Sequence, residues 1–173
     1  HYLKISNSTN VEMVEYWSLC NLFKEQKNDK GEEYYLRNLR SLLDSSVEYR
    51  MISDVPFGAF LSGGVDSSVI TSIMSKNSST PIKTYSIGFK EKGYNEFEYA
   101  NIIASKFKTD HHEIVMNGDD YMETMDELIS YKDAPLSVPN EVPLYLMCKE
   151  LKKDITVVLS GEGADEIFGG YGR

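Results

Sequence analysis

Short apolar runs alternate with longer amphipathic stretches through most of this 173-residue chain, and this alternation constrains the fold more than any other feature. The runs that predict strands are residues 55–61, 83–89, 113–116 and 155–159. The stretches that predict helices are residues 32–51, 66–76, 95–107, 119–131 and 144–152. Strands separated by helices form βαβ units. The predicted fold is therefore a doubly wound α/β fold, whose mainly parallel sheet carries helices on both faces.

Composition excludes some classes of partner. With 27 acidic and 18 basic residues the formal net charge is −9, which disfavours a nucleic-acid surface but permits a mononucleotide held by backbone amides and a metal ion. No stretch approaches the roughly 18 apolar residues that a membrane span needs, so no membrane partner is expected. The two cysteines, Cys20 and Cys148, lack metal-ligand spacing, and their small number is typical of a reducing compartment. A cytoplasmic protein is the expectation.

A glycine-rich loop, SGGVDSS, follows the first predicted strand at residues 62–68. Ligands of parallel sheets lie beyond the carboxyl ends of the strands, and glycines let the backbone approach an anion there. The following helix supplies unpaired N–H groups, and the hydroxyls of Ser62, Ser67 and Ser68 add further donors. Asp66 would repel a phosphate unless Mg²⁺ bridges the two, so the pattern predicts a magnesium–phosphate site. The alternative is a tight strand-to-helix turn, with Asp66 as an ordinary acid of the first helical turn.

A second glycine-rich loop follows the last predicted strand at residues 160–172. Its three carboxylates, Glu162, Asp165 and Glu166, lie within five residues, and a cation or a proton-transfer role would offset their repulsion. Asp165 is the candidate for a second magnesium ligand beside Asp66. Glu162, nearest the strand end, would face the reacting centre. The alternative is an acidic first helical turn on a solvated surface.

The adjacent histidines of the segment His111-His112-Glu113 suggest a metal site at first sight. Adjacent residues of a strand point to opposite faces of a sheet, so the two imidazoles are not expected to share a metal ion.

Four segments resemble one known family. Residues 62–68 resemble the pyrophosphate-binding loop of the ATP pyrophosphatase superfamily, which asparagine, GMP and NAD synthetases share. Residues 159–171, LSGEGADEIFGGY, resemble the more specific second signature of the glutamine-hydrolysing asparagine synthetases and their close relatives. Between these loops, residues 85–89 (YSIGF) and 109–113 (TDHHE) resemble the same family in the same order. The resemblance runs from about residue 30 to the end of the chain.

The resemblance implies a role for each matching residue. Leu61 and Ile87 would contact the adenosine part of ATP, and Ser160 with Gly161 would form a further ATP contact. The implied cradle for the pyrophosphate group is Ser62, Gly63, Gly64, Val65, Asp66, Ser67 and Ser68. Asp66 and Asp165 match magnesium ligands. Glu162 matches a glutamate that takes part in forming the aspartyl-adenylate and in the ammonia step.

The resemblance also implies a domain organisation. Residues 29–173 would form an ATP pyrophosphatase-type synthetase domain with an adenine nucleotide α-hydrolase-like fold, truncated at its C-terminus. Residues 1–28, which show no strong periodicity, are expected to be an N-terminal extension or a linker remnant. The family's glutaminase domain uses an N-terminal cysteine as nucleophile, whereas this chain starts at His1. Glutamine hydrolysis is therefore expected only of a full-length parent.

The implied reaction is the ATP-dependent formation of an amide. Aspartate would be activated as aspartyl-adenylate with release of pyrophosphate, and ammonia would then give asparagine and AMP. Two alternatives are left open: a related enzyme that amidates or cyclises another carboxylate, and a truncated ATP-binding module without turnover. A homodimer is also left open.

Overall fold

The computed structural model describes residues 1–173 except 7–9, 25–27, 92, 94 and 172–173, and it divides into two compact units, His1–Leu39 and Arg40–Arg173. In the first unit, β1 (Tyr2–Ser6) pairs antiparallel with β2 (Asn10–Val14), and α1 (Leu19–Lys24) follows. The sequence pattern did not predict this strand pair. Helix α2 (Glu32–Met51) contains the boundary between the units and has the predicted bounds. The predicted boundary at residue 28, between an extension and a synthetase domain, stays a prediction.

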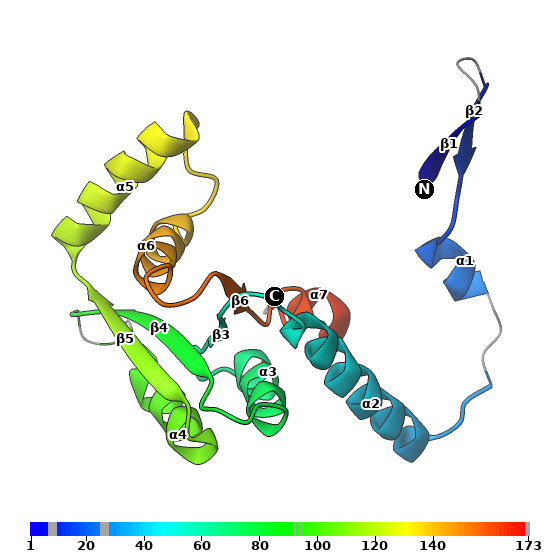
Figure 1. Ribbon diagram of the computed structural model, residues 1–173, viewed down its shortest axis with the longest axis horizontal. Coiled ribbons are helices and arrows are strands. Elements are labelled where there is room, and N and C mark those ends of the chain that lie inside the picture. The colour runs from blue at the N-terminus through cyan, green and yellow to red at the C-terminus, as the bar shows by residue number, and fades with distance from the viewer. Residues whose placement is uncertain (7–9, 25–27, 92, 94, 172–173) are drawn as a thin grey trace. The chain divides into compact units, whose positions relative to one another are not determined.

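A parallel four-stranded sheet forms the centre of the second unit, in the order β5-β4-β3-β6 (Figure 1). Its strands are β3 (Phe57–Phe60), β4 (Lys83–Phe89), β5 (Asp110–Met116) and β6 (Val157–Leu159). All three neighbouring pairs in this sheet run parallel. The structure therefore confirms the predicted parallel α/β architecture.

Helices cover both faces of this sheet (Figure 1). They are α3 (Val65–Lys76), α4 (Phe97–Phe107), α5 (Gly118–Lys132) and α6 (Glu141–Leu151), and the short α7 (Ala164–Phe168) follows β6. Ala59 packs with α3 and Leu61 with α4, whereas Phe60 between them packs against the cluster that contains Met147 of α6. Because successive residues of a strand point to opposite faces, α3 and α4 cover one face and α6 covers the other. Helix α5 packs on α6.

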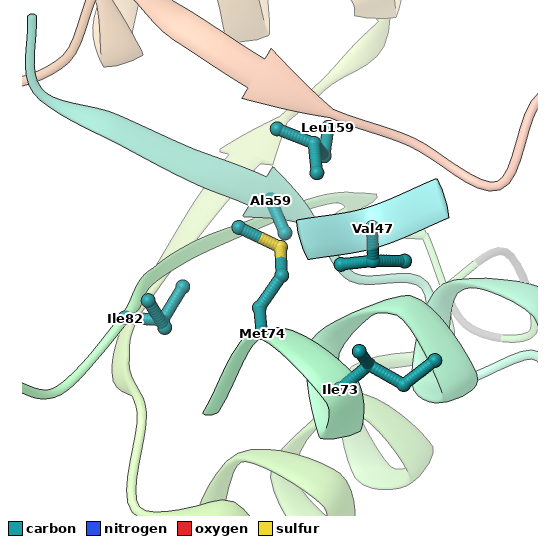
Figure 2. Close-up of a cluster of buried hydrophobic side chains, with 6 residues drawn as sticks. All are labelled: Val47, Ala59, Ile73, Met74, Ile82 and Leu159. Atoms are coloured by element: carbon teal, nitrogen blue, oxygen red, sulfur yellow. The ribbon is translucent and has the colours of Figure 1, made fainter. Parts of the chain in front are cut away.

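One buried cluster joins the central strand to its neighbours (Figure 2). In Figure 2 the side chains of Ala59 and Leu159 from two strands point toward those of Ile73 and Met74 from α3. Val47 from the last turns of α2 and Ile82, which precedes β4, complete the cluster. The cluster holds β6 beside β3, so it positions the loops that follow both strands. No helix in the described part of the chain is both long and apolar enough to cross a membrane.

Thr71→Val is expected to raise the free energy of unfolding by about 1 kcal/mol, because the change removes a buried hydroxyl that lacks a hydrogen-bond partner. Thr71 lies in α3, is fully buried, and its Oγ1 has no partner within the described residues. Urea unfolding followed by circular dichroism measures the change. Thr84→Val is the matched control: Thr84 is equally buried, but its hydroxyl contacts Thr109 and His111, so stability should fall. A rise in both variants would contradict the argument.

Candidate functional site

Two glycine-rich loops leave neighbouring strands at the same edge of the sheet. The chain passes from β3 through β4 to β5 and then returns to β6 on the other side of β3. This reversal places a topological switch point between β3 and β6, and ligands of such sheets bind outside the carboxyl ends of the strands at that point. Residues 62–64 follow β3, and residues 160–163 follow β6. Both predicted loops therefore lie at the switch point.

The first loop passes closely over helix α4. Gly63 has a φ of +84°, in the left-handed region that favours glycine. A Cβ atom there would lie 2.5 Å from the Cβ of Tyr99 and 2.6 Å from the backbone nitrogen of Ala100. Position 63 is thus restricted to glycine both by its backbone conformation and by its neighbours.

The serines of the first loop bond mainly to the loop itself. The Oγ atoms of Ser62 and Ser67 lie 3.0 Å apart, and the Ser62 N–H donates to Ser67 Oγ over 3.3 Å. The hydroxyls of Ser67 and Ser68 both donate to the carbonyl of Gly64, over 3.3 and 2.6 Å. The sequence analysis treated these hydroxyls as donors to a phosphate, whereas in the structure they form hydrogen bonds within the loop. A donor role toward a phosphate stays a prediction.

Helix α3 begins at this loop without a side-chain cap. Its N-cap residue is Gly64, and the exposed Val65 and Asp66 begin its first turn. The first N–H groups of a helix have no partners within the helix, and together with the helix dipole they attract an anion. Oxygen atoms of a phosphate are suitable partners for these groups.

The second loop lies directly against the first. A Cβ atom at Gly161 would lie 2.9 Å from the Cβ of Asp66 and 3.2 Å from the backbone nitrogen of Ser67. Ser160 and Glu162 on either side of Gly161 are exposed, and the Glu162 N–H donates to Ser160 Oγ over 3.4 Å. The structure therefore brings Asp66, Ser160, Gly161 and Glu162 to one place, although about 95 residues of chain separate the loops.

The two glutamates of the second loop have different surroundings. The hydroxyl of Tyr171 donates to the carboxylate of Glu166. This bond lowers the pKa of Glu166 from its ordinary value and raises the pKa of Tyr171 to about 12. Glu162 is exposed two residues before the start of α7. The two carboxylates therefore differ in their hydrogen-bond partners, and the roles predicted for them stay predictions.

Asp165, the other predicted magnesium ligand, is half-buried in α7. Its backbone carbonyl accepts the N–H groups of Gly169 and Gly170, over 2.8 and 3.2 Å, and Gly170 packs against its carboxylate. Asp66 of the first loop lies beside Gly161, which belongs to the same loop as Asp165. No group of three His, Cys, Asp or Glu side chains with metal-binding spacing occurs among the described residues. Mg²⁺ bound with a nucleotide commonly takes only one or two protein carboxylates plus phosphate oxygens, so this donor set fits it.

A cavity of about 380 Å³ opens beside the first loop. Leu61, Ser62 and Ile87, three of the residues predicted to contact ATP, line it. The Leu61 side chain is almost fully buried against α4, and its N–H donates to Tyr85 while its carbonyl accepts from Ser86. The cavity is also lined by residues that sequence reasoning missed, namely Phe60, Tyr85, Ser86, Gly93, Asn95, Glu96, Phe97 and Met147. Two signals were available: Tyr85 and Ser86 belong to the YSIGF segment that resembles the family, and residues 93–97 follow a predicted strand.

Comparisons with known proteins place the sequence in a family. A sequence model of the asparagine synthase family matches residues 38–173. Asparagine synthetase (glutamine-hydrolyzing) 1 of Bacillus subtilis is 41% identical over 140 residues, which are 81% of this chain and 22% of that protein. Asparagine synthetase B (glutamine-hydrolyzing) of Escherichia coli is 31% identical over 171 residues, with 90% of this chain and 29% of that protein covered. This chain therefore spans less than a third of the length of either relative.

A solved structure shares the fold. The NMN synthetase from Francisella tularensis matches with a TM-score of 0.50 and 18% sequence identity, over 83% of this chain and 60% of that one. At this identity the match supports the arrangement of strands and helices only.

Proposed function

This chain belongs to the asparagine synthase family, and we propose that it is the nucleotide-binding part of an enzyme that uses ATP to form an amide. In the proposed reaction a carboxylate oxygen of aspartate attacks the α-phosphorus of ATP, and pyrophosphate leaves. Ammonia then attacks the acyl carbon of the aspartyl-adenylate, and AMP leaves with the bonding electron pair. The products are asparagine, AMP and pyrophosphate.

One observation carries this proposal: the contact between Gly161 of the second loop and Asp66 at the start of α3. It puts the uncapped N-terminus of a 12-residue helix beside Gly161, the residue that precedes the exposed Glu162. The helix end attracts the phosphates that leave as pyrophosphate. A carboxylate at the same place suits a group that acts on the developing charges of the reaction. The cavity beside Leu61 and Ile87 offers space for the adenosine.

We propose roles for the residues on this basis. Residues 62–68 hold the pyrophosphate group, and Leu61, Ile87, Ser160 and Gly161 form the nucleotide contacts. Asp66 and Asp165 would hold Mg²⁺, which would neutralise charge on the leaving pyrophosphate. Glu162 acts on the forming adenylate. In the full-length protein, a glutaminase domain would supply the ammonia.

Titration of this chain with ATP, with and without Mg²⁺, tests the proposal. Asp66→Asn is expected to weaken binding of magnesium-ATP by about 10-fold or more, because a ligand of the metal is lost. Without Mg²⁺, the same change should leave ATP binding equal or stronger, because a negative charge near the phosphates is removed. A change in ATP affinity that has opposite signs with and without Mg²⁺ distinguishes a metal ligand from a residue that only stabilises the loop.

Asp119→Asn is the matched control for this experiment. Asp119 is an exposed acid in the first turn of α5, as Asp66 is in the first turn of α3. The control thus reproduces the loss of a charge at a helix start, away from the two loops, and should leave ATP affinity unchanged. Equal weakening by Asp66→Asn with and without Mg²⁺ would remove Asp66 from the metal site. Absence of ATP binding by the unmodified chain would overturn the proposed nucleotide site.

A further inference from the structure

A row of polar side chains runs beneath the first loop, on the face of the sheet that α3 and α4 cover. Thr109 Oγ1 lies 2.8 Å from Thr84 Oγ1, which lies 2.9 Å from His111 Nδ1. On the other side of the ring, His111 Nε2 lies 3.4 Å from Ser86 Oγ. The hydroxyl of Ser86 donates to the carbonyl of Leu61. Thr84 and Ser86 are buried, so competition from water for these bonds is reduced.

The chemistry of the last bond sets the direction of the whole row. A carbonyl only accepts hydrogen bonds, so the Ser86 proton points at Leu61, and Ser86 Oγ accepts from His111. The Nε2 atom of His111 must then carry a proton. In a neutral imidazole Nδ1 is consequently an acceptor, and it accepts a hydrogen bond from the Thr84 hydroxyl. Burial lowers the pKa of His111 below its ordinary value, in keeping with a neutral ring.

The end of this row is the peptide that begins the first loop. The carbonyl of Leu61 and the N–H of Ser62 belong to one planar peptide group, so fixing the orientation of the carbonyl also fixes that of the N–H. This N–H donates to Ser67 Oγ across the loop. On the preceding peptide, the Leu61 N–H donates to Tyr85 of β4. The orientation of the first loop amide therefore depends on the Ser86 hydroxyl, and the Ser86 hydroxyl is oriented by His111.

We propose that His111 is a positioning residue for the loop of residues 62–68, acting through Ser86 on the peptide between Leu61 and Ser62. That the loop binds ATP rests on the proposed function. The effect of His111 on the orientation of the loop does not. The neighbouring His112 has no part in the row. Its ring points to the other face and stacks on Tyr85 with 5.0 Å between the ring centroids, as expected for adjacent residues of a strand.

Two measurements on the unmodified, ligand-free chain and its variants test the proposal without any nucleotide. Nitrogen chemical shifts of the His111 ring should show a proton on Nε2 and none on Nδ1. In His111→Ala and in Ser86→Ala, the Ser62 amide should exchange with solvent about five-fold faster, relative to the Ala59 amide of β3, because one hydrogen bond no longer orients it. His111→Gln should restore most of the protection, because its side-chain amide offers a donor near the position of Nε2.

The control for general destabilisation is Leu128→Ala. Leu128 is buried in a cluster with Met116 and Val142 and is not among the residues that line the cavity, so the change weakens the fold without touching the row. It should leave the relative exchange of the Ser62 amide unchanged. A proton on Nδ1, or equal exchange ratios in His111→Ala and Leu128→Ala, would overturn the proposal. If His111→Ala does not fold, Ser86→Ala and His111→Gln decide the same question.

Titration with magnesium-ATP then connects the row to binding. His111→Ala and Ser86→Ala should each weaken affinity about five-fold, and the double variant should lose no more than Ser86→Ala alone, because both changes interrupt one path. Additive losses would overturn the path through Ser86. Failure of the unmodified chain to bind ATP would count against the proposed function only, since the ring tautomer and the amide exchange would still decide the role of His111.

Discussion

Gly63→Ala is expected to lower the free energy of unfolding by about 3 kcal/mol, because two costs add at this position. Its φ of +84° lies in a region that costs other residues about 1–2 kcal/mol. The new Cβ would also lie 2.5 Å from the Cβ of Tyr99 and 2.6 Å from the backbone nitrogen of Ala100. Relief of this overlap requires the loop or α4 to shift, and such overpacking typically costs about 1–3 kcal/mol.

Gly31→Ala separates the two costs. Gly31 has a φ of +81°, but no atom lies within 4 Å of the position of a Cβ there. Its loss in stability should be about 1–2 kcal/mol, because only the backbone conformation is unfavourable. Urea unfolding of both variants gives the comparison, and ATP titration should show weaker binding for Gly63→Ala alone. Similar losses in both variants would show that the contact between the loop and α4 contributes nothing.

Glu162→Gln is expected to lower the rate of aspartate-dependent pyrophosphate release by about 10²-fold, with little change in ATP binding. Glu162 is exposed next to Gly161, which lies against Asp66. In the proposed role this carboxylate would act on charge that develops during the reaction, and an amide of the same shape lacks the charge. The rate should be measured on the full-length protein with ammonia supplied. The binding comparison can be made on this chain.

Glu166→Gln is the matched control, four residues further along the same loop. The carboxylate of Glu166 accepts a hydrogen bond from the hydroxyl of Tyr171, and this bond ties α7 to the segment that follows it. The rate should fall much less than in Glu162→Gln. A larger effect of Glu166→Gln would reverse the proposed roles of the two glutamates.

The sequence predicted which elements exist better than where they begin. Strand β4 and helix α2 have the predicted bounds because their apolar periods are regular to the last residue. Helix α6 begins at Glu141 rather than residue 144, because Pro143 is tolerated in a first turn, where its missing N–H has no partner within the helix. Strand β5 begins at Asp110 rather than residue 113, since its first polar side chains find partners in the sheet.

The two loops and a metal site shared between them could be predicted, but the strand order that brings the loops together could not. Glycines and serines after an apolar run mark a phosphate loop through local chemistry alone. That Gly161 lies against Asp66 depends on the strand order, in which β6 joins β3 and not β5. The spacing of residues along the chain does not encode this order. The same holds for residues 95–97, which border the cavity only because β4 lies next to β3.

The pairing of β3 with β6 has a consequence for how the chain folds. Ala59 pairs with Leu159, so this contact closes a loop of 100 residues, whereas β3 pairs with β4 across a much shorter connection. Closure of a longer loop costs more chain entropy, and contacts between distant residues slow folding. The β3–β4–β5 part can therefore assemble before β6 docks, and the two loops meet only at the docking step. A ligand that binds both loops would stabilise this late step, and slower opening of β6 would report its presence.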